Sequence, residues 1–139
     1  MFLPETNLPA EILLVEDDAA LARALEAVLR RDGYPVVLAT NGRAAMDCIT
    51  KHRVALVISD IFMPDGDGLE LLNFLRRLTP HPPLVAMSGA GDGRVGNMLK
   101  VAGALGAARI LAKPFSPSQL LTLVRELIGP AVPGLVKEV

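Results

Sequence analysis

Apolar runs alternate with amphipathic stretches along most of this chain, and the alternation predicts strands and helices in turn. Five short runs are apolar almost throughout, which is typical of strands buried on both faces of a parallel sheet. They cover residues 11–15, 34–39, 54–59, 84–87 and 108–112. After each run, apolar residues recur at the three- and four-residue spacing of a helix that buries one face. The predicted helices cover residues 19–31, a segment that Asn41 caps, 68–78, 94–105 and 116–128.

Glycine, proline and capping residues separate these segments. Gly33 ends the first predicted helix, and Ser116 caps the last one with Pro117 at its first position. Gly129 and Pro130 then stop that helix. Five strands that alternate with five helices indicate an α/β fold, a three-layer sandwich in which helices cover both faces of a five-stranded parallel sheet.

Length and composition limit the chain to one domain. It has 139 residues, of which 51% are hydrophobic and 21% charged, as in ordinary soluble globular proteins. No apolar run approaches the roughly 20 residues that span a bilayer, and the first ten residues lack the features of a signal peptide. We expect a cytoplasmic protein without membrane contact, in which residues 1–10 extend the domain at 11–129 and residues 130–139 form a short tail. Cys48, the single cysteine, excludes an internal disulfide and is expected to be a packed thiol.

The charges are unevenly distributed, although the formal net charge is −1. Of the 15 acidic residues, 13 lie at or before Asp92, whereas residues 93–139 carry six Lys or Arg and two Glu. Phe115 is the one aromatic residue in that second segment, so scattered cations without aromatic neighbours make a weak case for nucleic-acid binding. We expect a surface for a protein partner there and no direct contact with nucleic acid.

Polar side chains follow every predicted strand, and those after four of the five are candidates for chemistry; the second strand is followed by the uncharged Thr40 and Asn41. The candidates are Glu16, Asp17 and Asp18 after the first strand, Asp60 after the third, Ser88 after the fourth and Lys113 after the fifth. The carboxyl ends of parallel strands meet at one edge of a sheet, where ligands of such folds bind. If the first and third strands are neighbours, their carboxylates converge and raise one another's pKa unless a cation neutralises them.

These residue types suit a site for a phosphoryl group. Carboxylate oxygens without His or Cys nearby favour Mg²⁺ among the divalent cations. Lys113 and Ser88 offer a cation and a hydroxyl that can bind anionic oxygens. Asp60 is the candidate nucleophile, because a carboxylate can accept phosphoryl to give an aspartyl phosphate.

Taken singly, each of these residues also has an ordinary structural explanation. The acids at 16–18 could complement a helix dipole, Ser88 could belong to a turn, and Lys113 could be a solvated loop residue. Asp65 and Asp67 are interpreted as turn and cap residues. His52 and His81 have no acidic residue at ligand spacing and are interpreted as surface residues.

Four segments together resemble the receiver domain of two-component response regulators. They are ILLVEDD, LVISDIFMPDGDGLELL, AMSGAG and GAARILAKPF, in this order over about residues 11–129. The resemblance implies a flavodoxin-like sheet of strand order 2-1-3-4-5, a bound Mg²⁺ and a phosphoacceptor domain that is not an enzyme. It also implies a role for each matching residue. At the metal, Asp17 binds directly, Glu16 acts through water and Phe62 contributes its backbone carbonyl. At the phosphoryl group, Asp60 is the acceptor, Ser88 is the switch hydroxyl and Lys113 binds phosphate, and the Lys113-Pro114 peptide is cis.

The same resemblance implies a signalling mechanism. A phosphohistidine on a sensor histidine kinase or a histidine phosphotransfer protein would donate its phosphoryl group to Asp60. Ser88 would then move inward and alter the surface of the fourth helix, fifth strand and fifth helix. That surface carries Arg94, Lys100, Arg109 and Arg125. It would bind a downstream protein partner, and the sequence leaves open whether it also forms a homodimer.

The sequence departs from the family at three positions. Ile110 stands where many receivers carry an aromatic residue, three residues before the lysine, so the resemblance does not extend to an aromatic switch. Phe62 and Ala90 stand two residues beyond Asp60 and Ser88, where polar side chains can steer an attacking water. Neither side chain can orient water, and we therefore predict slow loss of the phosphoryl group.

Three alternative functions remain open from the sequence. A phosphatase of the haloacid dehalogenase type also uses a strand-end Asp with Mg²⁺, but it generally needs a second carboxylate where Phe62 stands. A docking module could keep the fold and never be phosphorylated. The third alternative is nucleotide binding, because residues 91–96 match the dinucleotide-binding pattern G-x-G-x-x-G. A dinucleotide site would place that motif at the first strand with an acid about 20 residues on, so a flexible loop is preferred.

Overall fold

The computed structural model describes residues 10–61, 67–89, 100, 103 and 106–131. The strands are β1 (Glu11–Val15), β2 (Val36–Ala39), β3 (Val54–Asp60), β4 (Leu84–Gly89) and β5 (Arg109–Lys113). All pairings between them are parallel, in the order β2-β1-β3-β4-β5. This confirms the predicted strand order and places the carboxyl ends of all five strands along one edge.

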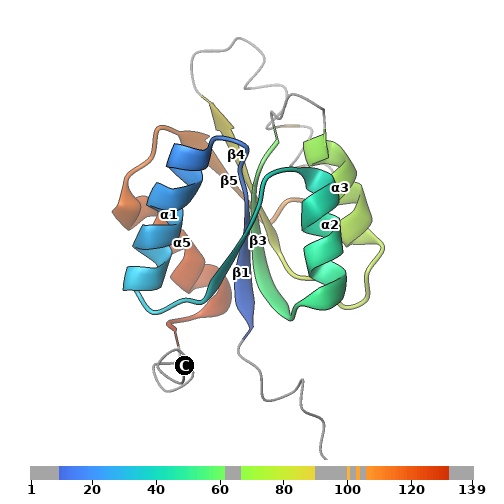
Figure 1. The fold of residues 1–139 in the computed structure, drawn as a ribbon, viewed down its shortest axis with the longest axis horizontal. Coiled ribbons are helices and arrows are strands. Elements are labelled where there is room, and N and C mark those ends of the chain that lie inside the picture. The colour runs from blue at the N-terminus through green and yellow to red at the C-terminus, as the bar shows by residue number, and fades with distance from the viewer. Residues whose placement is uncertain (1–9, 62–66, 90–99, 101–102, 104–105, 132–139) are drawn as a thin grey trace, which may run out of the picture.

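Helices lie on both faces of the sheet, as the predicted three-layer sandwich requires. They are α1 (Ala19–Arg31), α2 (Gly42–Lys51), α3 (Asp67–Arg76) and α5 (Pro117–Ile128). Figure 1 shows α1 and α5 on one face and α2 and α3 on the other. Of the predicted helix 94–105, Lys100 and Gly103 fall within the described residues, and both are helical. No helix in the described part of the chain is both long enough and apolar enough to cross a membrane.

Two apolar clusters hold the layers together, one on each face of the sheet. Neighbouring residues of a strand point to opposite faces, so Ile12 and Leu14 pack with Leu29 and Leu120, whereas Leu13 packs with Leu72 in the other cluster. The four strands β1–β4, which contribute buried residues to both clusters, therefore need apolar side chains at successive positions. This explains why the strands read as continuous apolar runs in the sequence.

Capping residues fix where three helices begin. Asn41 accepts a hydrogen bond from the Ala44 backbone at 2.8 Å, as predicted for the start of α2. Ser116 and Gln119 form a reciprocal capping box at the start of α5. Asp18 accepts from the backbone amides of Ala20 and Leu21 and caps α1. Local side-chain chemistry therefore explains these boundaries.

Several boundaries differ from the prediction for identifiable reasons. β2 begins at Val36 and not at residue 34, because the Tyr34 amide donates to Leu29 at the end of α1. β3, β4 and β5 extend to Asp60, Gly89 and Lys113, since backbone pairing continues past the last apolar residue. The polar residues at these ends are therefore part of the sheet and are held rigidly.

Candidate functional site

Acids from β1 and β3 and a lysine from β5 meet at the carboxyl edge of the sheet. The Lys113 ammonium donates hydrogen bonds to Glu16 Oε1 and to Asp60 Oδ2, each at 2.9 Å. Glu16 follows β1 directly, and Asp60 is the last residue of β3. Lys113 ends the outermost strand, β5, so its long side chain reaches past β4 to contact both acids. The structure thus brings together three residues that the sequence separates by up to 97 positions.

The two acids bound by Lys113 are almost inaccessible to solvent. Glu16 is 2% exposed and Asp60 is 6% exposed. Burying an ionised carboxylate is costly unless a cation and hydrogen bonds compensate it. Lys113 supplies both, which explains why the apolar strand β3 can end in the buried Asp60 carboxylate.

Burial and hydrogen bonding shift the pKa values of two groups in this cluster. Burial raises the pKa of the Glu16 carboxyl above its ordinary value, and this outweighs the lowering by its hydrogen bond with Lys113. Burial alone would lower the pKa of the Lys113 amine, but its hydrogen bonds to Asp60 and Glu16 raise it overall. Lys113 is therefore a permanent cation at neutral pH, held against two acids.

The acidic triplet at 16–18 divides into different roles. Asp18 caps α1, and its backbone amide donates to Glu16 Oε2 at 3.2 Å, which helps to hold that carboxylate. Asp17 is exposed between them. One carboxylate oxygen from each of Glu16, Asp17 and Asp60 lies within 4.8 Å of the others. The predicted convergence of acids from the first and third strands is confirmed.

This donor set fits a hard divalent cation. Each of the three acids offers an oxygen ligand, the type that Mg²⁺ prefers, and one of them faces solvent, from which an ion can arrive. Three acids face one lysine, so negative charge remains for a cation to neutralise. Phe62, whose carbonyl was predicted to complete the metal site, lies outside the described residues.

Ser88 lies at the same edge, on the strand between β3 and β5. It is completely buried, and within the described part of the chain its hydroxyl has no hydrogen-bond partner. A buried polar group without a partner typically costs about 1–3 kcal/mol, so such a group calls for an explanation. A hydroxyl kept free beside the ends of the neighbouring strands is available to an anionic acceptor that arrives there.

The remaining predicted positions divide between described and undescribed residues. Ile110 is 38% exposed, and the Lys113-Pro114 peptide is cis as the family resemblance implied. Asp65, Ala90 and residues 91–96 lie outside the described residues, so their predicted roles stay predictions.

Some interactions could not be read from the sequence. His52 is exposed as predicted, yet its Nδ1 lies 2.7 Å from Glu11 Oε1, an acid 41 positions away. The Tyr34 hydroxyl donates to the Gly129 carbonyl at 2.7 Å and joins the segment between α1 and β2 to the C-cap of α5. Both contacts link residues with no periodic relationship, so no spacing pattern could reveal them.

Comparison with known proteins agrees with this geometry. A model of the response regulator receiver domain matches residues 12–125. Response regulator protein FleR of Pseudomonas aeruginosa is 41% identical over 128 residues, which are 90% of this chain and 26% of FleR. The crystal structure of a response regulator signal receiver domain from Bermanella marisrubri has a TM-score of 0.78 at 33% identity, covering 86% of this chain and 98% of that chain. The solution structure of the beryllofluoride-activated NtrC4 receiver domain dimer has a TM-score of 0.75 at 27% identity, covering 85% and 95%.

The chain spans only part of its longer relatives, 26% of FleR and 52–57% of seven other curated relatives. The family match decides against the phosphatase alternative. In receiver domains an acidic cluster such as Glu16, Asp17 and Asp60 is typical of the Mg²⁺ site, and the domain generally has a sensor kinase as partner. The chain belongs to the response regulator receiver domain family, as a CheY-like phosphoacceptor module of two-component signalling and not an enzyme.

Proposed function

We propose that Asp60 accepts a phosphoryl group from a phosphohistidine on a sensor histidine kinase or a histidine phosphotransfer protein. The observation that carries this proposal is the Lys113 ammonium, 2.9 Å from the carboxylates of both Asp60 and Glu16. It holds the Asp60 carboxylate at the sheet edge and lies where the oxygens of an incoming phosphoryl group need a cation.

The transfer breaks one bond and forms another. A carboxylate oxygen of Asp60 bonds to phosphorus while the bond from phosphorus to the donor imidazole nitrogen breaks. The electron pair of the broken bond stays on the imidazole, which can then take up a proton. Lys113 stabilises the negative charge on the phosphoryl oxygens, and its raised pKa keeps it protonated throughout.

We assign Mg²⁺ binding to Glu16, Asp17 and Asp60, together with the backbone carbonyl of Phe62. The support is the cluster of three carboxylate oxygens within 4.8 Å. Asp17 is the exposed member and is assigned as a direct ligand, and Glu16, already bound to Lys113, acts through water. When bound, the ion neutralises negative charge on the phosphoryl oxygens.

Ser88 is assigned as the group that senses the phosphoryl group. Phosphorylation adds about −1.5 to −2 charges at neutral pH. The Ser88 hydroxyl is buried without a partner in the described part of the chain and can donate to a phosphoryl oxygen. Its movement would pull on the segment after β4 and so change the surface formed by the fourth helix, β5 and α5.

A downstream protein fits this surface better than nucleic acid does. Arg109 donates to Glu126 at 2.8 Å, and Arg125 donates to both carboxylate oxygens of Asp32. These acids neutralise two of the four cations predicted to make the surface basic. Ile110, an exposed residue of β5, offers an apolar contact for a protein partner. The NtrC4 receiver forms a dimer in its activated state, which supports a homodimer as one occupant of this surface.

The domain limits and location follow from the same proposal. We assign the receiver domain to residues 11–129, with residues 1–10 as an extension and 130–139 as a tail. A domain that receives phosphoryl from a sensor kinase works in the compartment of the kinase's phosphohistidine, which we assign to the cytoplasm.

Intact-mass spectrometry after incubation with acetyl phosphate and Mg²⁺ tests the proposed function. We expect the wild-type chain to gain the mass of one phosphoryl group and Asp60→Asn to gain none. Omission of Mg²⁺ should slow the reaction strongly. If the wild type gains no mass, and a beryllofluoride mimic also leaves it unperturbed, the chain is instead a docking module that keeps only the fold.

The lifetime of the product tests the two apolar positions next to the site. Phe62 and Ala90 cannot orient an attacking water, so the purified phosphoprotein should lose its phosphoryl group slowly. Decay within a few seconds would contradict this proposal.

A further inference from the structure

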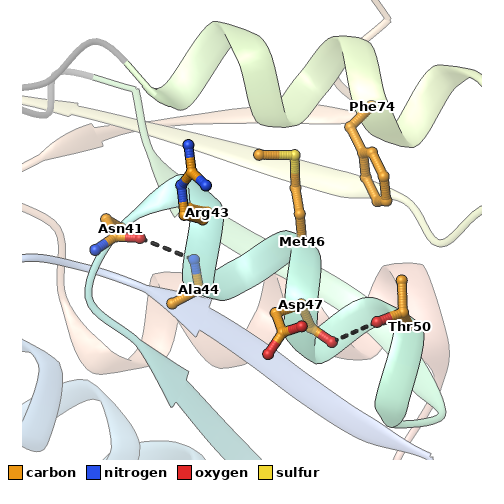
Figure 2. Close-up of a pocket in the computed structure, with 7 residues that line it drawn as sticks. All are labelled: Asn41, Arg43, Ala44, Met46, Asp47, Thr50 and Phe74. Atoms are coloured by element: carbon orange, nitrogen blue, oxygen red, sulfur yellow. Dashed lines mark hydrogen bonds between the residues drawn. The ribbon is translucent and has the colours of Figure 1, made fainter.

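An open groove lies between α2 and α3 (Figure 2). These two helices cover the face of the sheet opposite to α1 and α5 (Figure 1). The groove has a volume of about 600 Å³ and is lined from Asn41 at one end to Thr50 and Phe74 at the other. None of its lining residues belongs to the cluster of Glu16, Asp60 and Lys113. The groove is therefore a second site, separate from the proposed phosphorylation site.

The middle of the groove is apolar. Met46 extends from α2 across the gap toward α3, and the Phe74 ring points from α3 into the same space (Figure 2). Both side chains are only partly buried, so each still has apolar surface to offer. Methionine is flexible and fits its shape to an incoming side chain, which makes it frequent in surfaces that bind helices.

Most polar groups of the groove already have partners. The Asn41 side chain accepts from the Ala44 amide and caps α2. The Thr50 hydroxyl donates to the Asp47 carbonyl at 2.7 Å, and the Asp47 carboxylate accepts from Lys51 at 3.1 Å. Arg43 is exposed, and within the described part of the chain its guanidinium makes no hydrogen bond or ion pair. The charged group of the groove that has no partner among the described residues is therefore a cation.

A second cation, Arg77, follows the groove residue Phe74 by three positions. The Arg77 amide bonds to the Phe74 carbonyl in a tight turn at the end of α3, where side chains three residues apart project from the same side. Arg77 is exposed and has no ion pair among the described residues. Residues 42–51 and 67–77 together carry four Lys or Arg against three acids, in a chain whose net charge is −1. These helices thus carry a small excess of cations, with Arg43 in the groove and Arg77 just after Phe74.

We propose that the groove between α2 and α3 binds an acidic amphipathic helix of a partner protein, with an apolar side chain seated between Met46 and Phe74 and carboxylates paired with Arg43 and Arg77. This is the arrangement by which an amphipathic helix commonly docks in a groove. A small molecule fits less well, because such sites enclose most of their ligand and this groove is open. A second copy fits less well too, since a two-fold contact would bring like charges and two concave surfaces together.

Synthetic peptides about four helical turns long test the proposal. One peptide has Leu along one face and Glu on both sides of it, a second has Lys in place of Glu, and a third has the acidic composition in scrambled order. We expect the acidic amphipathic peptide to bind with micromolar affinity by fluorescence anisotropy, and both others at least roughly tenfold more weakly. Backbone amide shifts on peptide addition should concentrate in α2 and α3. No binding at millimolar peptide, or equal binding of the Lys peptide, overturns the proposal.

Matched variants assign the binding to the groove. Arg43→Glu should weaken the acidic peptide by roughly fivefold, and more at low salt. Arg23→Glu, the same change at an exposed position of α1 on the other face, should leave binding unchanged. Equal effects of the two changes would contradict the proposal. So would a dimer in sedimentation equilibrium that Arg43→Glu dissociates, because the occupant would then be a second copy.

This proposal goes beyond the proposed phosphorylation and can fail independently of it. Asp60→Asn should bind the acidic peptide as the wild type does. Loss of peptide binding in Asp60→Asn would show that the groove depends on the phosphorylation site and would contradict the separation stated here.

Discussion

Two clusters of cation and carboxylate in this domain have similar contact distances but differ in their exposure to solvent. At the carboxyl edge, Lys113 contacts Glu16 and Asp60, whose side chains are 1% and 8% exposed. Between α5 and the end of α1, Arg125 contacts Asp32 through two hydrogen bonds, but those side chains are 48% and 23% exposed. The hydrogen bonds in both clusters span 2.6–3.2 Å, so contact distance does not separate them.

The two clusters differ in burial and therefore in what they contribute to stability and function. An exposed ion pair gains little over the solvated charges, so its presence needs no functional reason. A buried cluster pays a desolvation penalty that well-packed apolar residues would avoid, and it is a weak means of gaining stability. Charges kept in a buried position at a ligand-binding edge therefore point to chemistry.

Lys113→Met gives the largest expected effect. It leaves Glu16 and Asp60 buried without their cation, and the free energy of unfolding should fall by about 3 kcal/mol. We place the loss at the lower end of the range for broken buried pairs because the Lys113 side chain stays 20% exposed. Urea denaturation in the presence of a chelator measures the change. An unchanged midpoint and slope would show that the cluster is not effectively buried.

Mg²⁺ should stabilise the folded chain through the acids at the carboxyl edge. At ten times its dissociation constant, a ligand that binds only the folded state adds about 1.4 kcal/mol to the free energy of unfolding. Asp17→Asn should abolish this increment with little change in the metal-free protein, because Asp17 is exposed. Urea denaturation with and without MgCl₂, at matched ionic strength, measures it.

Asp18→Asn is the matched control for that experiment. It removes a charge at the adjacent position, yet asparagine caps a helix as well as aspartate does, so α1 should be unaffected. The stabilisation by Mg²⁺ should survive in Asp18→Asn. If both variants lose the stabilisation by Mg²⁺ equally, the ion responds to the overall negative charge of this segment and not to a defined site.

Tyr34, a buried residue near the exposed pair of Arg125 and Asp32, gives a prediction about pH. Burial, followed by the nearby Asp32, raises the pKa of the Tyr34 hydroxyl above its ordinary value of 10.0, and only the protonated hydroxyl can donate to Gly129. A group whose pKa is raised by folding stabilises the fold below its unfolded pKa and loses that effect as pH rises through the folded value. The contribution, about 1 kcal/mol for a hydrogen bond, should thus be present below pH 10 and disappear above it.

The absorbance of tyrosinate measures this ionisation directly, because the chain has one tyrosine and no tryptophan. Tyr34→Phe should be less stable than the wild type at neutral pH, and the difference should close in strongly alkaline solution. Ionisation of Tyr34 below pH 10 would show that its hydroxyl is not held in the folded state.

The pair of Arg125 and Asp32 should give the smallest effect. A double-mutant cycle with Arg125→Met and Asp32→Asn should yield a small coupling free energy that added salt reduces further, because both charges keep contact with water. A coupling as large and as insensitive to salt as that of Lys113 would remove the contrast between the two regions.

Sequence reasoning identified the residues of the carboxyl edge better than their contacts. Asp60 and Lys113 were found because an apolar run ending in a charged residue is a signal along the chain, and the order of the strands placed them at one edge. That Lys113 bridges Glu16 as well as Asp60 depends on how far one side chain reaches across β4, which no spacing encodes.

Strand ends and distant polar contacts were the least predictable features. The predicted strands stop at Ser59 and Met87, yet backbone pairing carries β3 and β4 further. The contact of His52 with Glu11 joins an exposed histidine to a partly buried acid at the start of β1, and no pattern in the sequence pairs the two. The predictions for Phe62 concern a residue outside the described part and await direct measurement.

The central claim is that the phosphoryl group is carried by Asp60. Borohydride reduces an aspartyl phosphate to homoserine, so reduction of the phosphorylated chain followed by peptide sequencing in a mass spectrometer locates the modified residue. We predict homoserine at position 60 and at no other acid. Modification at Asp17 or Glu16, or phosphorylation of Asp60→Asn to the wild-type extent, would contradict the account.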